Sequence, residues 1–278
     1  MSWLQSILIA VLQGATELFP VSSLGHAVVL PGLLGMKIDQ ASADFLPFIV
    51  MLHLGTAVAL LLYFWRDWWS LGVVSLGFGQ PEEVFAARKM LVLIVVATIP
   101  AALAGFLLEK IVRGFFATPI IAASFLVANG VLLLFGEGLR AKTHRPLYAL
   151  TWVDALFIGC FQCLALLPGI SRSGATMVAA LLRGVNHAGS AHFSFLIATP
   201  IIFGATLHQV PKLLHAGVQP GVFVMASVAA VVAGITAWLT TWLLMRFFRN
   251  NDNWALTPFA LYCLAFGGFS VLAYRFWL

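Results

Sequence analysis

Charged residues are scarce in this sequence. Of its 278 residues only 9% are Asp, Glu, Lys or Arg, whereas 62% are hydrophobic. Since about a quarter of the residues in a soluble domain are charged, this composition excludes a soluble globular protein, a disordered tail and a nucleic-acid-binding protein. The apolar stretches are also too long and unbroken for the alternating strands of an outer-membrane barrel. The class that remains is a polytopic helical membrane protein.

Cysteines are few, and they form no disulfide framework. Cys160, Cys163 and Cys263 all lie in apolar stretches, and an odd number cannot pair completely. Cys160 and Cys163 have the spacing of a redox motif, but one turn apart in a lipid-buried helix they are expected to be packing residues. The N-terminus lacks a basic region, because the first Lys or Arg is Lys37, and we therefore expect no secretory signal.

Stretches without charged residues predict six full membrane-spanning helices, because a helix needs about 20 residues to cross the hydrocarbon core. They are 45–65, 90–108, 116–136, about 190–209, about 220–245 and 254–275. Two further apolar segments, 3–35 and 152–186, are interrupted by Pro, Gly and Ser and carry a charge inside. We expect each of these two to break within the membrane and turn back as a re-entrant pair of half-helices.

The distribution of Lys and Arg predicts the orientation in the membrane. If each broken segment returns to its starting side, one side holds nine Lys and Arg residues and the other five. The positive-inside rule places the richer side in the cytoplasm, with loops 66–88, 137–150 and 246–253. Both chain termini are then outside.

An internal repeat relates the two broken segments. The first contains QGATELFPVSSLGH (13–26) and the second QCLALLPGISRSGAT (162–176). Three pairs of matching residues stand 149 positions apart: Gln13 and Gln162, Ser22 and Ser171, and Gly25 and Gly174. We predict one membrane domain over 1–278, with repeats of about 1–140 and about 150–278. Because three full spans follow each broken pair, the second repeat is expected to be inverted relative to the first.

Glu17 lies inside the first broken segment, where a carboxylate costs a few kcal/mol without a polar environment. Gln13, four residues earlier, shares its helical face. Together the two side chains offer oxygen ligands to a hard divalent cation, Mg²⁺ or Ca²⁺. The alternative is that the Glu17 carboxylate is held in an interhelix hydrogen bond.

The residues after Glu17 predict an anion site. Pro20 ends the first half-helix, and Ser22 and Ser23 can cap the next one, whose N-terminal N–H groups attract anions. Ser23 also offers a hydroxyl nucleophile, and His26, three residues later, is a candidate base or hydrogen-bond donor. The alternative for His26 is a packing role.

The second broken segment places an arginine at membrane depth. Arg172 keeps its charge, and its planar fork suits phosphate oxygens; an ion pair with Glu17 is the alternative. Hydroxyl groups near it supply helix caps and further donors: Ser171, Ser173 and Thr176. Both segments together suit a diphosphate with a bound divalent cation, and the apolar walls suit a lipid tail. The residues alone leave open a phosphatase and a transporter, since inverted repeats with broken helices are transporter architecture.

Three polar residues outside this set are expected to be structural. Asp154 is predicted to be an N-terminal cap or a partner of the helix dipole. His187 is expected at the membrane interface, and Asn129 is expected to make a polar contact from within its helix.

The two motifs resemble those of the bacterial undecaprenyl-diphosphate phosphatases, also called the bacitracin-resistance family. Two more stretches match, HLGTAVALLLYFWRD (53–67) and FSFLIATPIIFGAT (193–206), so the likeness covers nearly the whole chain. The resemblance implies a hydrolase of the bacterial cytoplasmic (inner) membrane that removes the terminal phosphate of undecaprenyl diphosphate. The product is the carrier lipid for peptidoglycan synthesis, and its recycling confers bacitracin resistance. The implied fold is an inverted repeat whose active site opens to the outer side.

The resemblance also assigns roles to the site residues. The catalytic set comprises Glu17, Ser23, His26 and Arg172, and the cation ligands are Glu17 and Gln13. The groups expected to bind substrate are Ser22, Ser171, Arg172, Ser173 and Thr176. The expected partners are the polyprenyl diphosphate and membrane lipid, with no nucleic acid, and a homodimer is compatible with the resemblance. A transporter or flippase for lipid phosphates is the alternative function.

Three positions depart from the family pattern. Leu24 replaces a usual Thr, Ile49 stands where an acidic residue commonly follows the Phe, and His192 replaces a common Glu. The first change is expected to alter packing only, whereas the other two put in doubt any supporting role of those positions at the site.

Overall fold

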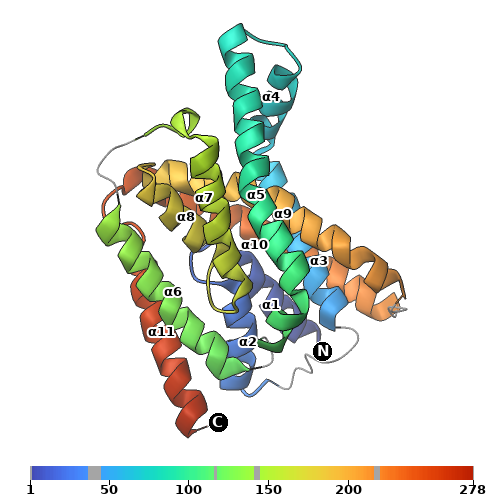
Figure 1. Cartoon of the computed structure of the whole chain (residues 1–278). Coiled ribbons are helices and arrows are strands. Elements are labelled where there is room, and N and C mark those ends of the chain that lie inside the picture. The colour runs from blue at the N-terminus through green and yellow to red at the C-terminus, as the bar shows by residue number, and fades with distance from the viewer. Residues whose placement is uncertain (1, 37–44, 116–117, 141–144, 216–219, 278) are drawn as a thin grey trace.

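The chain is represented by a computed structural model that describes residues 2–36, 45–115, 118–140, 145–215 and 220–277. In these residues all the named elements are helices (Figure 1). The α-helices are α1 (Trp3–Thr16), α2 (Ser23–Leu33), α3 (Phe45–Tyr63), α4 (Trp65–Ser75), α5 (Pro81–Phe115), α6 (Pro119–Leu139), α7 (Trp152–Gln162), α8 (Arg172–Leu182), α9 (His187–His215), α10 (Pro220–Asn250) and α11 (Thr257–Phe276). Two short 3₁₀ helices, η1 (Leu147–Ala149) and η2 (Cys163–Leu166), flank α7.

The long helices confirm a multi-pass membrane protein. Five of them are long and apolar enough to cross a membrane: α5, α6, α9, α10 and α11. A sixth candidate span is the pair α3 and α4, which is bent by 66° at a short break. The predicted helix over 45–65 is thus present, but the predicted loop over 66–88 is largely helical. Pro81 at the start of α5 and the carboxylates of Glu82 and Glu83 in its first turn explain the helical continuation, because both features favour a helix N-terminus.

Both predicted broken segments are pairs of half-helices. In the first, which we call hairpin one, α1 ends at Thr16 and α2 begins at Ser23. In the second, hairpin two, α7 and η2 are followed by a turn before α8 begins at Arg172. A serine caps the second half-helix in each case, because the Ser22 and Ser171 hydroxyls accept hydrogen bonds from N–H groups three residues later.

The packing of the helices agrees with an inverted repeat. Hairpin one packs through α1 on α10, and hairpin two packs through α7 on α5. In the same way α3 packs on α10 and α9 packs on α5. An inverted repeat requires these corresponding pairs, and the repeat itself stays a prediction.

Small residues bring the half-helices against the backbones of their neighbours. A Cβ added at Gly14 of α1 would lie 2.4 Å from the Ala233 carbonyl oxygen of α10. A Cβ at Gly159 of α7 would lie 2.5 Å from the Ala97 carbonyl oxygen of α5. Glycines therefore permit the close helix packing that fixes both hairpins in the bundle.

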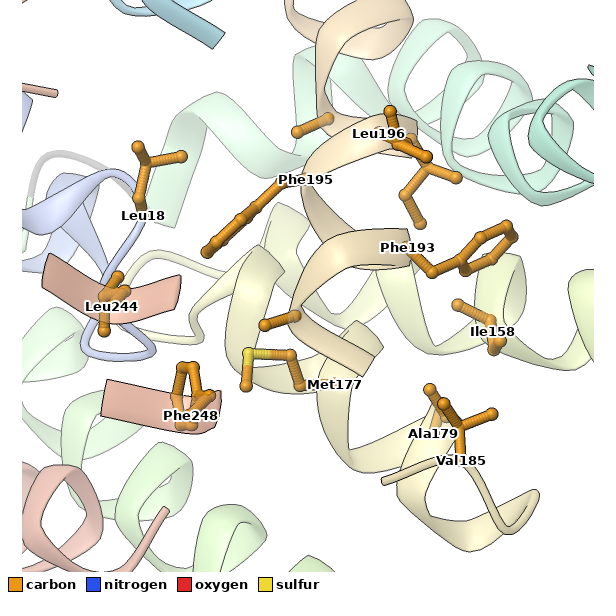
Figure 2. Packing of buried hydrophobic residues seen from close by; sticks show 14 of the residues in the cluster. Leu18, Ile158, Met177, Ala179, Val185, Phe193, Phe195, Leu196, Leu244 and Phe248 are labelled. Atoms are coloured by element: carbon orange, nitrogen blue, oxygen red, sulfur yellow. The ribbon is translucent and has the colours of Figure 1, made fainter. Parts of the chain in front are cut away.

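The main hydrophobic core surrounds α8 and α9. Every side chain of α8 from Ser173 to Leu181 is buried. Figure 2 shows Phe195 of α9 and Met177 of α8 on the side that faces Leu244 and Phe248 of α10. Hairpin two is therefore enclosed by protein on all sides of its second half-helix.

Ionic groups hold together the helix ends on the side that the charge distribution places in the cytoplasm. Asp154 forms a capping box with Thr151, which confirms its predicted role, and it also pairs with Arg145 (3.1 Å) and Arg183. His187, the first residue of α9, is buried. Its Nε2 lies 3.0 Å from a Glu137 carboxylate oxygen, and its Nδ1 lies 2.8 Å from Asp252. The sequence gives no sign of these two distant carboxylates, and the interfacial position of His187 stays a prediction.

Candidate active site

The turns of the two hairpins meet inside the bundle. Ser171 and Ser173, at the start of α8, both donate hydrogen bonds to the Phe19 carbonyl oxygen in the turn of hairpin one (3.3 and 3.1 Å). A Cβ at Gly25 would lie 2.9 Å from the Cα of Gly169, so the backbones of the two turns are in direct contact. This contact brings together the two motifs that the sequence places 149 residues apart.

Glu17 is the centre of the polar side chains at this junction. Its Oε2 accepts hydrogen bonds from the Ser23 hydroxyl (2.6 Å) and from the Gln13 amide (3.0 Å). Its Oε1 lies 3.4 Å from Nη2 of Arg172. The carboxylate is only 8% exposed, and the guanidinium side chain 13%. The structure therefore brings together four of the predicted site residues, and the alternative ion pair between Glu17 and Arg172 is present.

The turn of hairpin one is held in an unusual backbone conformation. Ser22 has a φ of 69°, a left-handed value that is uncommon for residues other than glycine. Its hydroxyl caps α2 by accepting from the Gly25 N–H at 3.2 Å. Such conformations persist where the surrounding structure enforces them, and they concentrate at functional sites. Here the conformation starts α2 at Ser23 after a short turn, so that the Ser23 hydroxyl in its first turn reaches the Glu17 carboxylate.

His26 is placed differently from Ser23. Its Nδ1 lies 2.7 Å from the Ser22 carbonyl oxygen and its Nε2 lies 2.8 Å from the Tyr262 hydroxyl. The ring is 1% exposed and stacks on Phe266, with ring centroids 5.0 Å apart. Both ring nitrogens are thus engaged by groups other than Ser23, and the structure gives His26 the surroundings of a residue that holds α2 in place against α11.

The hydroxyl groups of hairpin two form hydrogen bonds with other groups of the protein. Ser171 and Ser173 bond each other (3.0 Å) as well as Phe19. The Thr176 hydroxyl donates to the Arg172 carbonyl oxygen (2.9 Å) and lies 2.7 Å from the Ser194 hydroxyl of α9. All three hydroxyl residues are buried, and only Arg172 of this segment reaches Glu17.

Three residues at the junction have a larger part than the sequence indicated. Asn129 of α6 joins the hairpins, since its amide donates to the Pro20 carbonyl oxygen and its own oxygen accepts from the Ser171 N–H (both 2.9 Å). Tyr262 holds His26, and His53 of α3 has its Nε2 at 3.9 Å from Glu17. A polar residue inside an apolar span was the available signal for Asn129 and His53, but only the fold shows which carboxylate or backbone group each one meets.

Two of the three departures from the family pattern lie outside this junction of polar groups. His192 of α9 lies 3.2 Å from Asp67 of α4 and stacks on Phe64. Ile49 contributes its backbone carbonyl oxygen, which is 2.9 Å from Nδ1 of His53. Leu24 is half-buried in the first turn of α2. Among the described contacts, none of these three side chains bonds to Glu17 or Arg172.

The arrangement has the groups needed for chemistry on a phosphate ester or anhydride. A guanidinium and the N-termini of α2 and α8 attract negative charge. A hydroxyl in contact with a carboxylate can attack or can orient a water molecule. The side chains around these groups are apolar, and the low dielectric they create strengthens each electrostatic interaction at the site.

Comparisons with known proteins agree with this chemistry. A sequence model of the bacitracin resistance protein BacA family matches residues 6–269. The undecaprenyl-diphosphatase of Granulibacter bethesdensis is 59% identical over 280 residues, which cover 96% of this chain and 95% of that protein. That of Acidiphilium cryptum is 55% identical with 99% of both chains covered, and undecaprenyl-diphosphatase 2 of Oenococcus oeni is 39% identical with 96% and 97% covered. Because this family model matches residues 6–269 and these relatives match nearly the whole chain, the chain belongs to the bacitracin resistance protein BacA family.

Proposed function

We propose that this protein hydrolyses undecaprenyl diphosphate to undecaprenyl phosphate and inorganic phosphate. The observation that carries the proposal is the junction of Glu17, Ser23 and Arg172 between two half-helix N-termini inside a membrane bundle. Relatives with the printed name undecaprenyl-diphosphatase match over the whole chain. The reaction returns the carrier lipid to peptidoglycan synthesis and thereby supports bacitracin resistance.

Arg172 is proposed to bind the terminal phosphate. In the structure its guanidinium pairs with Glu17 at 3.4 Å, which is long for a charge-assisted hydrogen bond. A diphosphate offers the guanidinium a bidentate contact with more negative charge, so substrate would compete with Glu17 for it. Ser22, Ser171, Ser173 and Thr176 shape the two helix starts that face the phosphate, and their own hydroxyls bond within the protein.

The attacking group is either the Ser23 hydroxyl or a water molecule. The hydrogen bond from Ser23 to Glu17 orients the hydroxyl and gives its proton an acceptor. Growing charge on the transferred phosphoryl group would be stabilised by Arg172 and the N–H groups of the helix starts. For His26 to transfer a proton, its ring would have to exchange Tyr262 for the reacting group, and we therefore propose that it mainly positions α2.

The donor set at Glu17 fits a divalent cation that is shared with the substrate. Among the described residues no three His, Cys, Asp or Glu side chains gather at one point, as a cation held by protein alone requires. Mg²⁺ is commonly held by one or two carboxylates together with substrate phosphates and water. Glu17 would hold the ion on the protein side, and the Gln13 amide would join it by turning its oxygen, in place of the nitrogen that now donates to Glu17, toward the ion. When bound, the cation would neutralise diphosphate charge and favour departure of the lipid phosphate.

An apolar cavity beside these groups suits the first isoprene units of the lipid. It measures about 190 Å³ and lies between α1 and α2, where its walls include Ile9, Leu12, Ala27, Leu30 and Pro31. Ile9 stands one turn before Gln13, and Ala27 one turn after Ser23, so the cavity continues the polar faces of both half-helices. A diphosphate at Glu17 would therefore have its prenyl chain in apolar surroundings.

We propose that this site opens to the outer side of the cytoplasmic membrane, as the family resemblance implies, and that both chain termini lie on that side, as the distribution of Lys and Arg indicates. Figure 1 shows both chain ends at one end of the bundle and the turn between α4 and α5 at the other. The orientation can be tested with Ser2→Cys and Gly79→Cys, each introduced after replacement of Cys160, Cys163 and Cys263. A membrane-impermeant thiol reagent applied to whole cells should label residue 2 and spare residue 79, and the reverse pattern would contradict the orientation.

Phosphate release by the purified protein in detergent tests the proposed reaction. Undecaprenyl diphosphate should yield inorganic phosphate with Mg²⁺ or Ca²⁺, and EDTA should abolish release. A lipid-phosphate flippase without hydrolytic activity would release no phosphate under either condition. Full turnover in excess EDTA would remove the cation from the proposal while leaving the phosphatase.

A further inference from the structure

His53 is a polar residue at the site to which neither hairpin motif assigns a role. It lies on α3, and its Nε2 is 3.9 Å from Glu17 Oε2, the same oxygen that accepts the Ser23 and Gln13 hydrogen bonds. The side chain is 30% exposed, which makes it more open than Glu17 or Arg172. The imidazole therefore borders the space in front of the carboxylate.

The other ring nitrogen determines what Nε2 can do. Nδ1 of His53 lies 2.9 Å from the Ile49 carbonyl oxygen, one helical turn earlier. A carbonyl oxygen only accepts hydrogen bonds, so Nδ1 carries the proton and the neutral ring has its lone pair on Nε2. This is the arrangement of metal-bound histidines, which donate the remote N–H to a backbone carbonyl or a carboxylate and bind the ion through the other nitrogen.

The distance between Nε2 and Glu17 suits a bridging ion. At 3.9 Å the two atoms are too far apart for a hydrogen bond. Bonds from a divalent cation to imidazole nitrogen and carboxylate oxygen measure about 2.0–2.2 Å each, so two such bonds span slightly more than the observed gap. A cation could therefore contact both atoms without a shift of α1 or α3.

We propose that His53 is a protein ligand of the divalent cation, through Nε2 and together with Glu17. The proposal deepens the proposed function, because it rests on the cation bound at Glu17. A nitrogen ligand beside carboxylate and amide oxygens changes the preferred ion, since imidazole suits transition metals and all-oxygen sites suit Mg²⁺ and Ca²⁺. Mn²⁺ should accordingly bind more tightly than either of those two ions.

Electron spin echo spectroscopy of Mn²⁺ on the full-length protein in detergent tests this ligand directly. Wild-type protein should show ¹⁴N modulation from one coordinated imidazole. His53→Gln and His53→Ala should both lose the modulation. Both should also bind Mn²⁺ at least about tenfold more weakly, because even the loss of a residue that only hydrogen-bonds a metal ligand weakens metal binding by about tenfold or more. His192→Gln, which removes an imidazole near Asp67 from α9, should retain the signal and the affinity.

Each other outcome contradicts the proposal. Nitrogen modulation that persists in both His53 variants, or Mn²⁺ bound by the wild type without modulation, would exclude His53 as a ligand. Failure of the wild type to bind Mn²⁺ would exclude the site. Thermal melting of the variants shows whether they are folded. Phosphate release by the wild type in the same preparation tests the proposed reaction separately, because a phosphatase whose cation has no nitrogen ligand still releases phosphate.

Discussion

The two hairpins share a motif and a capping serine, yet they contribute different things to the site. In hairpin one, the Ser23 hydroxyl donates to the Glu17 carboxylate, and an apolar cavity opens between the half-helices. In hairpin two, the hydroxyls are buried and bond to the backbone or to other hydroxyls, and Arg172 alone reaches Glu17. In the proposed reaction, hairpin one carries the reactive groups, whereas hairpin two supplies a rigid frame and one charge.

Burial explains this difference. α8 lies in the main core and is enclosed by other helices, whereas α2 borders an apolar cavity and packs mainly on α1 and α6. A buried hydroxyl must find a partner inside the protein, so those of hairpin two are committed to its architecture. Repetition of a sequence motif thus does not imply repetition of its chemical role.

The largest expected effect comes from Glu17→Gln in hairpin one. The amide is nearly isosteric but lacks the charge that would hold the cation and accept the Ser23 proton. We expect phosphate release to fall by about three orders of magnitude, the size of losing a principal electrostatic contact. Glu82→Gln, at the exposed start of α5, is the matched control and should retain turnover. Near-normal activity of Glu17→Gln would move the chemistry away from hairpin one.

Arg172→Lys tests the single charge that hairpin two contributes. Lysine keeps the charge but loses the bidentate fork, and the loss of about 3 kcal/mol of transition-state stabilisation lowers turnover roughly a hundredfold. Turnover and thermal melting should be measured for Arg172→Lys and Arg172→Ala in the same detergent. If the lysine variant is fully active and the alanine variant melts early, Arg172 is only the structural partner of Glu17.

Asn129→Leu tests the connection between the hairpins. The change leaves the Pro20 carbonyl and the Ser171 N–H buried without their partner, which costs about 2 kcal/mol of stability. The melting temperature in detergent should fall while the protein that remains folded keeps its KM. Ser124→Ala, at an exposed position of the same helix, should change stability by less than about 0.5 kcal/mol. An unchanged melting temperature for Asn129→Leu would mean that the hairpins are held by apolar packing alone.

The smallest effects compare one serine from the first turn of the second half-helix in each hairpin. Ser23→Ala removes the hydroxyl on Glu17 and should lower turnover at least about tenfold through loss of an oriented reacting or positioning group. Ser173→Ala removes a buried bond to Phe19 and should cost about 1 kcal/mol of stability with turnover nearly unchanged. Equal losses of turnover in both variants would show that the hairpins share the chemistry.

The sequence predicted the larger features correctly for physical reasons. Apolar stretches of membrane length have few alternatives to a helix, because backbone groups in lipid must bond internally. Proline and serine marked both breaks, at Pro20 to Ser22 and at Pro168 to Ser171, since they end one half-helix and cap the next. The prediction of a loop over 66–88 missed the helical residues of α4 and the start of α5. A helix that leaves the membrane loses the apolar pattern by which it is recognised in the sequence.

By itself, then, the sequence determined the membrane class and the two broken segments, and it singled out Glu17, Ser23 and Arg172 as candidate site residues. These inferences depend on local composition and on the cost of charge in lipid. Only the tertiary structure decided which distant groups each polar side chain meets. His26 is bound by Tyr262, 236 residues away in the chain, and His187 by Glu137 and Asp252. Such pairings arise from the packing of helices that are far apart in the chain, and a single sequence carries no local signal of that packing.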